Sequence, residues 1–191
     1  ETCRKEESPY VRSLNGAWKF FHTMADRIPK MVEQADFDVS TWDEIRVPGV
    51  WELQGYGTPV YLGASYPEPV DVNPEHIPHI RQNMNEVGIY KREFEIPTDW
   101  TRREIFVHFG AAKSALQVFV NGIEVGRSKG SMNPAEFCIT NHVKAGCNQI
   151  TAVVYRFSDG TYLENQDMWA FSGIYRDVYV YSEARVYPRD F

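Results

Sequence analysis

Short runs in which apolar and polar residues alternate recur along most of the chain. In the run 88–97, Tyr90, Phe94 and Ile96 share one parity and would line one face of a strand. The runs are spaced by about 8–12 residues, and no convincing helical pattern separates them. The pattern predicts an all-β fold, an antiparallel sandwich with the jelly roll as its preferred version. The predicted strands span 17–22, 45–47, 88–97, 103–110, 115–122, 123–128, 135–140, 148–156, 174–182 and 184–188.

Two connections between these runs carry information of their own. Asn121-Gly122 stands between two alternating runs, and both residue types accept the positive φ of a two-residue hairpin turn. The segment 48–87 holds more than half of the 11 prolines together with several glycines. Because proline lacks a ladder donor, this segment predicts a long structured loop region of the kind that is often functional.

Composition narrows the class of protein. The chain has 191 residues, of which 43% are hydrophobic, so it can bury a sizeable core. The net charge of -6 argues against a nucleic-acid partner, because phosphate binding needs a basic face. No apolar run approaches the length of a membrane span, which argues against a membrane partner.

The three cysteines, Cys3, Cys138 and Cys147, do not resemble a disulfide framework. A Cys138–Cys147 bridge is disfavoured but remains open. The N-terminus lacks both an initiator methionine and a signal-peptide pattern, as in a processed or excised chain. The compartment, cytoplasm or periplasm, therefore stays open.

A search for catalytic and metal motifs finds little. His76 and His79 form the only close histidine pair, and Pro78 forbids the helix that would place both on one face. A solvated loop is therefore favoured over a metal site there. Phosphate-binding, nucleophile and zinc motifs do not occur in the sequence.

The segment 162–169, YLENQDMW, follows neither strand nor helix periodicity. Asp159-Gly160 before it predicts a turn, and the four polar residues from Glu164 to Asp167 predict a loop wall. Two interpretations stay open at this point. The loop is either plain surface, pinned to the core by Tyr162, Met168 and Trp169, or a wall whose carboxylates face a sugar or a cation.

Four stretches together resemble the N-terminal sugar-binding domain of bacterial β-galactosidases of glycoside hydrolase family two. The last stretch, RFSDGTYLENQDMWAFSGIYRDV, is similar to the closing part of that domain. The others are similar, in order, to its opening strand, its proline-rich loop and its central hairpin. They span 13–20, 47–67, 109–140 and 156–178.

The resemblance implies a jelly roll and a retaining β-galactosidase as the parent protein. In that family the two catalytic glutamates lie on a separate barrel of about 250 residues, which a chain of this length does not hold. It therefore implies no catalytic residue in this chain, which alone is expected to be inactive. Residues 1–182 are expected to form the domain, and 183–191 to begin a connection to a following domain. The resemblance also implies a β-galactoside substrate shared with the barrel, and a homo-oligomeric parent.

The same resemblance assigns roles to individual residues. Asp167 matches the acid that approaches the galactose hydroxyls and helps hold a monovalent cation, sodium. The parent is also expected to use magnesium, whereas no ion is expected to bind tightly to this chain alone. Glu164, Asn165 and Trp169 are expected to shape the loop. Gly63, followed by Ala64, stands where the family often has an asparagine that hydrogen-bonds the sugar.

Several alternatives remain beside this interpretation. A lectin-like carbohydrate-binding module has the same fold, and so has a purely structural domain that mediates oligomer contacts. β-Glucuronidases and β-mannosidases of the same family share this first domain, although the loop at 162–169 favours a galactosidase.

Overall fold

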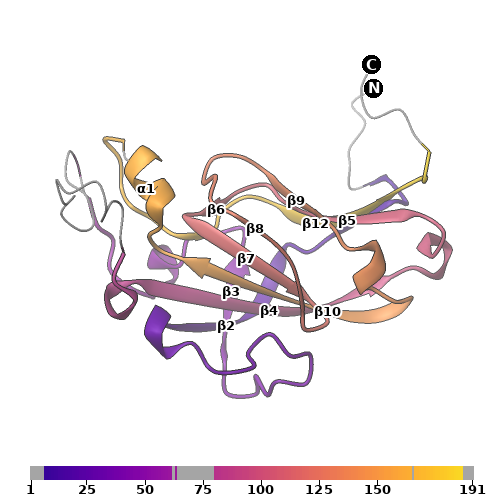
Figure 1. Ribbon diagram of the computed structural model, residues 1–191, viewed down its shortest axis with the longest axis horizontal. Coiled ribbons are helices and arrows are strands. Elements are labelled where there is room, and N and C mark those ends of the chain that lie inside the picture. Colours follow the sequence, from indigo (N-terminus) through magenta and orange to yellow (C-terminus); the bar gives the residue numbers. More distant parts are fainter. Residues whose placement is uncertain (1–6, 62, 64–79, 165, 187–191) are drawn as a thin grey trace.

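The computed structural model describes residues 7–61, 63, 80–164 and 166–186, and the fold is an all-β antiparallel sandwich (Figure 1). One sheet has four strands in the order β1-β12-β5-β9, and the other has six in the order β3-β2-β4-β10-β7-β8. After β4 the chain passes repeatedly from one sheet to the other, which is the connectivity of a jelly roll. The predicted fold class is therefore confirmed.

The strands of the four-stranded sheet are β1 (Val11–Ser13), β12 (Val178–Glu183), β5 (Glu104–Phe109) and β9 (Ala135–Cys138). Those of the six-stranded sheet are β3 (Asp43–Val47), β2 (Gly16–Met24), β4 (Glu86–Ile96), β10 (Gly146–Tyr155), β7 (Ala115–Val120) and β8 (Ile123–Ser128). Two short strands, β6 (Ala112–Lys113) and β11 (Gly173–Ile174), pair with each other. Single 3-10 turns span Ala25–Arg27, Glu52–Gln54, Gln82–Met84, Thr98–Trp100 and Thr140–His142.

The main core lies between the two sheets, because alternate residues of each strand point inward. In β5 the inward residues are Ile105, Val107 and Phe109, and all three are buried. They share one apolar cluster with residues of β10 such as Ile150 and Val154. Side chains of both sheets thus meet in a single core, as the alternation predicts.

A second apolar cluster covers the outer face of the six-stranded sheet. Val87, Ile89 and Val153 point to this face and pack against Val32 and Trp42, which belong to the segment between β2 and β3. Because both faces of β10 are covered, five consecutive residues of this strand, 150–154, are buried. The central strand is therefore buried on both faces, and Thr151 is the one polar residue in this run.

The hairpin prediction is confirmed. Asn121 and Gly122 have φ values of 50° and 83°, and they connect β7 to β8, with Val120 paired to Ile123. Other predicted boundaries were wrong. Residues 184–186 form no strand, and the predicted strand 174–182 is interrupted between β11 and β12. The structure adds β1 and β6, which are too short for alternation to reveal.

The prediction of a turn at Asp159-Gly160 without any helix was wrong, because residues Asp159–Glu164 form the short helix α1. Ser158 begins it: its backbone N–H donates to the Thr161 hydroxyl at 3.0 Å, while its carbonyl accepts from the Thr161 N–H at 3.0 Å. This reciprocal contact resembles a capping box, and Asp159 adds a negative charge in the first turn. Among the described residues, no helix is long and apolar enough to span a membrane.

Candidate functional site

Two loops that are about a hundred residues apart in sequence meet at the end of the sandwich beside α1 (Figure 1). Tyr61 and Trp169 form an isolated antiparallel bridge, and the Ala170 N–H donates to the Val60 carbonyl at 2.7 Å. The first loop belongs to the proline-rich segment and the second follows α1. The two family-like stretches around these residues therefore form one edge of the molecule.

Asp167 lies on this edge, exposed to solvent, and the Tyr61 hydroxyl donates a hydrogen bond to its Oδ1. Tyr61 and Trp169 are 53% and 51% exposed, and their ring centroids are 5.7 Å apart. Trp169 also stacks on Phe171, with centroids 6.0 Å apart. An accessible carboxylate thus lies among accessible aromatic rings, a combination that suits the hydroxyls and the C–H face of a sugar.

The other residues singled out from the sequence lie in different places. Gly63 follows Tyr61 by two residues and has a φ of 55°, whereas Ala64 and Asn165 lie outside the described residues. Glu164 ends α1, and its Oε1 accepts a hydrogen bond from the Ser131 N–H at 2.9 Å. The structure therefore brings Asp167, Trp169 and the segment of Gly63 together, while Glu164 binds the loop that follows β8.

The alternative view of this loop assumed that Tyr162, Met168 and Trp169 pin it to the core. That is wrong for Trp169, which is half exposed. Met168 is partly buried, with its Sδ 3.8 Å from Lys113 Nζ, and Tyr162 is also partly buried. The loop is instead held from beneath by a buried arginine.

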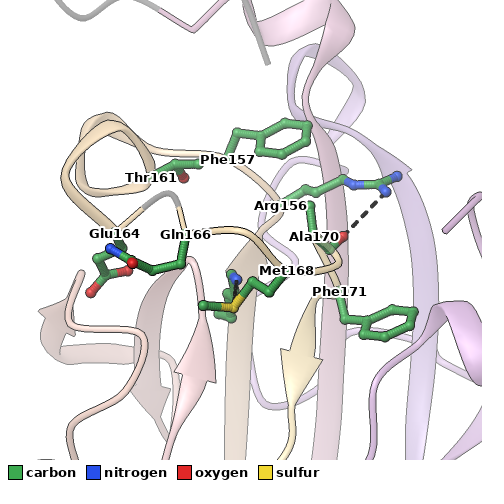
Figure 2. A pocket seen from close by; sticks show the side chains of 9 residues that line it. Arg156, Phe157, Thr161, Glu164, Gln166, Met168, Ala170 and Phe171 are labelled. Atoms are coloured by element: carbon green, nitrogen blue, oxygen red, sulfur yellow. Dashed lines mark hydrogen bonds between the residues drawn. The ribbon is translucent and has the colours of Figure 1, made fainter. Parts of the chain in front are cut away.

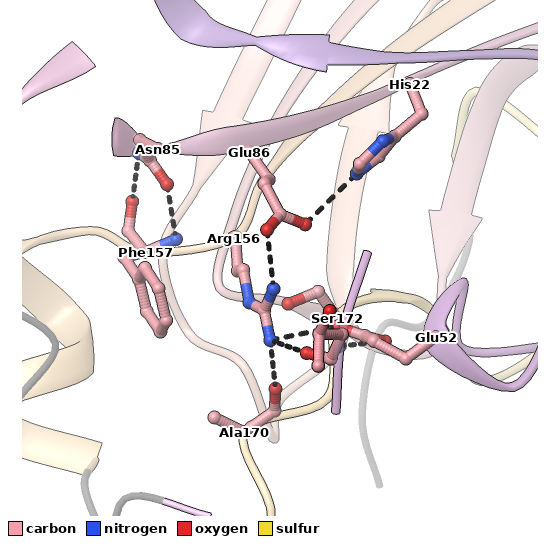
Figure 3. A network of polar contacts seen from close by, with 9 residues as sticks. His22, Glu52, Asn85, Glu86, Arg156, Phe157, Ala170 and Ser172 are labelled. Atoms are coloured by element: carbon pink, nitrogen blue, oxygen red, sulfur yellow. Dashed lines mark hydrogen bonds and ion pairs between the residues drawn. The ribbon is translucent and has the colours of Figure 1, made fainter. Parts of the chain in front are cut away.

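Arg156 lies at the end of β10, and its side chain is only 3% exposed (Figure 3). Its Nη1 donates to Glu86 Oε1 at 2.8 Å. Its Nη2 donates to the Thr58 carbonyl at 2.6 Å and lies 3.5 Å from the Ala170 carbonyl. One guanidinium therefore contacts the backbone of both loops that form the edge.

Two carboxylates flank this arginine in different environments. The Glu86 Oε2 is 3.1 Å from His22 Nε2, and the hydrogen bond from His22, reinforced by Arg156, lowers the pKa of Glu86. Burial raises the pKa of Glu52, although its Oε2 accepts from the Ser172 N–H at 3.0 Å. Glu52 Oε1 accepts no hydrogen bond from the residues that the structure describes and is 3.8 Å from Arg156 Nη2.

Sequence reasoning missed this network, since its members come from β2, from β4, from the position directly after β10 and from two loops. Asn85 extends it: its side chain donates to the Phe157 carbonyl at 2.8 Å and accepts from the Phe157 N–H at 2.9 Å. One signal was available in the sequence. Arg156 directly follows the apolar run of β10, where a charge needs a partner.

Beneath the loop lies a small cavity, shown in Figure 2. Its volume of about 10 Å³ is room for one water molecule at most, so a hexose cannot enter it. Its lining residues are Lys113, Arg156, Phe157, Thr161, Glu164, Gln166, Met168, Ala170 and Phe171. This cavity is therefore not the sugar site, whereas Tyr61, Asp167 and Trp169 lie on the outer edge, exposed to solvent.

Metal and cysteine chemistry find little support in the part of the chain that the structure describes. That part holds no cluster of three or more His, Cys, Asp or Glu side chains that could hold a metal ion. The pair His76 and His79 lies outside the described residues. Cys138 and Cys147 are both free and exposed, so the Cys138–Cys147 bridge is not formed.

Comparison with known proteins identifies the class. Residues 11–184 match the family described as glycosyl hydrolases family 2, sugar binding domain, and the chain belongs to this family. The resemblance seen in the sequence is thereby confirmed.

Curated relatives carry the comparison further. The chain is 41% identical to a β-galactosidase of Psychromonas ingrahamii over 186 residues, which are 97% of the chain and 17% of that protein. It is also 41% identical to a β-galactosidase of Priestia megaterium over 190 residues, 98% of the chain and 18% of that protein. The chain therefore spans less than a fifth of the length of these relatives.

Solved structures agree on the fold. A β-glucuronidase of Bacteroides uniformis matches with a TM-score of 0.67 and 22% identity, over 91% of the chain and 18% of that protein. A β-glucuronidase of an uncultured Clostridium matches with a TM-score of 0.65 and 19% identity, over 97% of the chain and 31% of that protein. At these identities the likeness concerns the fold alone.

Proposed function

We propose that this chain is the non-catalytic sugar-binding domain of a retaining β-galactosidase and contributes one wall of the galactoside pocket. The observation that carries the proposal is the exposed Asp167 carboxylate, which Tyr61 contacts and Trp169 borders. The identity of 41% to curated β-galactosidases favours galactosides over the glucuronides named for structural neighbours at 19–22% identity.

In this proposal the chain binds and orients the sugar but does not cleave it. The Asp167 carboxylate accepts hydrogen bonds from galactose hydroxyls, and charged acceptors give short, strong bonds. The aromatic rings of Tyr61 and Trp169 exclude water from the C–H face of the sugar. The two catalytic carboxylates, about 5 Å apart in a retaining enzyme, belong to a barrel outside this chain.

The same proposal includes a monovalent cation, sodium, next to Asp167. The fit is partial, because Asp167 offers one carboxylate and no acid-rich cluster surrounds it among the described residues. Magnesium is likewise part of the proposal for the full-length parent protein.

Kinetics of the full-length protein test the proposal against its alternatives. We expect hydrolysis of aryl β-galactosides far faster than of β-glucuronides or β-mannosides, and no turnover by the 191-residue chain alone. Turnover by the chain that survives repurification would overturn the assignment as a non-catalytic domain. A full-length protein that prefers glucuronides would overturn the substrate class.

A further inference from the structure

Tyr61 and Asp167 form a hydrogen-bonded pair across the two loops, and the pair is open to solvent. Tyr61 is the donor, and this hydrogen bond raises the pKa of Tyr61 above its ordinary value. The hydroxyl therefore stays protonated at neutral pH and keeps donating to the carboxylate. Among the described residues, the hydrogen bond to Asp167 is made to its Oδ1.

The position of Tyr61 is fixed by its surroundings. Its backbone forms the bridge to Trp169, and its ring contacts the ring of Trp169. Behind this bridge, the Arg156 guanidinium contacts the carbonyls of Thr58 and Ala170, one in each loop. Loop positions set by a buried ion network thus place the hydroxyl opposite the carboxylate.

The side chain of Asp167 is exposed, and among the described residues its hydrogen bond comes from Tyr61. An exposed carboxylate samples several rotamers, and ordering it on binding would cost affinity. A hydrogen bond between two exposed groups adds little to folding stability. The effect of the Tyr61 hydroxyl should therefore appear in ligand binding rather than in stability.

We propose that Tyr61 is a positioning residue, whose hydroxyl fixes Oδ1 of Asp167 and thereby presents Oδ2 to a hydroxyl of the sugar. This inference rests on the proposed function and adds a residue that acts through Asp167. It defines Tyr61 as a determinant of affinity for galactosides, distinct from any group that touches the reacting atoms.

The test replaces Tyr61 by phenylalanine in the full-length protein, which keeps the ring and removes one oxygen. The matched control is Tyr56→Phe, because the Tyr56 hydroxyl also donates to an aspartate, Asp43 Oδ2, at 3.0 Å. For Tyr61→Phe we expect KM for an aryl β-galactoside to rise by roughly 3- to 10-fold, with kcat nearly unchanged. Tyr56→Phe should leave both constants at the wild-type values.

A second measurement observes the contact directly in the chain. NMR of tyrosines labelled at Cζ, with Tyr61 assigned by the signal lost in Tyr61→Phe, follows the ionisation of single hydroxyls. Asp167→Asn should lower the pKa of Tyr61 toward its ordinary value, because the hydrogen bond to Asp167 raises it. The pKa of Tyr56, which burial and Asp43 raise, should not move.

The outcomes separate this inference from the proposed function. A wild-type protein without activity on β-galactosides would overturn the proposed function, and the inference with it. An active wild type whose Tyr61→Phe variant matches Tyr56→Phe would overturn only the inference. A fall in KM would also overturn it, since the hydroxyl would then compete with the sugar for the carboxylate.

Discussion

Replacing Arg156 by methionine tests whether the buried ion network holds the two loops of the candidate site. Methionine has a similar length and no charge, so it fills much of the same space. The change removes the ion pair with Glu86 and the hydrogen bond to the Thr58 carbonyl. It also leaves Glu52 and Glu86 in a partly buried region without their shared cation.

The magnitude follows from the burial of the arginine. Removing one partner of a buried ion pair typically costs about 3–5 kcal/mol, because the other charge stays buried and uncompensated. For a domain of this size, each kcal/mol lowers the melting temperature by about 2–4 °C. Arg156→Met should therefore lower it by about 6–20 °C.

Thermal unfolding of the chain, followed by circular dichroism at pH 7, is the assay. Arg127→Met is the matched control, because Arg127 makes a bidentate pair with Glu124 at 2.6 and 2.9 Å but is 67% exposed. An exposed pair contributes about 0–1 kcal/mol, so this variant should melt within about 4 °C of the wild type. Adding Glu86→Gln to Arg156→Met should recover part of the loss, since one uncompensated charge disappears.

The reasoning fails if Arg156→Met melts no lower than Arg127→Met. The network would then be a passive feature of the fold. It would also fail if the double variant were as unstable as the sum of its two single variants, because the charges would then not be coupled.

Three further predictions concern pH, affinity and Gly63. Burial raises the pKa of Glu52, so the folded state favours its protonated form, and Glu52→Gln should stabilise the chain at pH 7 but not below pH about 4. The pKa of Glu86 is lowered, so its contribution to stability is present above its unfolded pKa and is lost as the pH falls; Glu86→Gln should therefore destabilise the chain at pH 7. Melting temperatures of the two variants that shift in the same direction at pH 7 would refute this pair of predictions. Calorimetric titration of the chain with galactose should give a Kd weaker than about 1 mM, because half a pocket forms few hydrogen bonds; micromolar binding would favour a lectin-like module. Gly63→Asn should change stability by less than about 1 kcal/mol, because asparagine tolerates the φ of 55° and, among the described residues, an added Cβ would meet Tyr61 Cε1 at 3.6 Å, an ordinary van der Waals contact; a drop in melting temperature above about 5 °C would contradict this.

Much of the fold could be predicted from the sequence, because alternation reports which residues face the core. Strands such as β5 and β7 keep a strict alternation of buried and half-buried residues, and their limits were found to within a residue or two. Helix α1 was missed because Asp159-Gly160 is a strong turn signal, whereas the contact between Ser158 and Thr161 needs the three-dimensional arrangement. β1 has three residues and pairs with a strand far along the chain, so it carries no local pattern.

The candidate site was only partly predictable, for a related reason. Asp167 was identified by resemblance, and its place on an exposed edge was not evident from periodicity. Its partner Tyr61 precedes it by 106 residues. The network around Arg156 joins pairs of residues up to 120 apart, which no local pattern links. Contacts of this range follow from the pairing of β2, β4 and β10 within one sheet and from the meeting of two loops, which a single sequence does not display.

The kinetics of Asp167→Asn in the full-length protein test the central claim most directly. Asn keeps the shape and removes the charge, and Asp43→Asn is the control, because Asp43 also accepts from a tyrosine. Loss of a charged acceptor costs about 1.5–3 kcal/mol, so kcat/KM for a β-galactoside should fall by about 10- to 150-fold per folded molecule. Melting of the chain should stay within about 2 °C, and Asp43→Asn should leave kcat/KM within about 3-fold of the wild type. An unchanged kcat/KM in correctly folded Asp167→Asn would contradict the claim and remove Asp167 from the galactoside pocket.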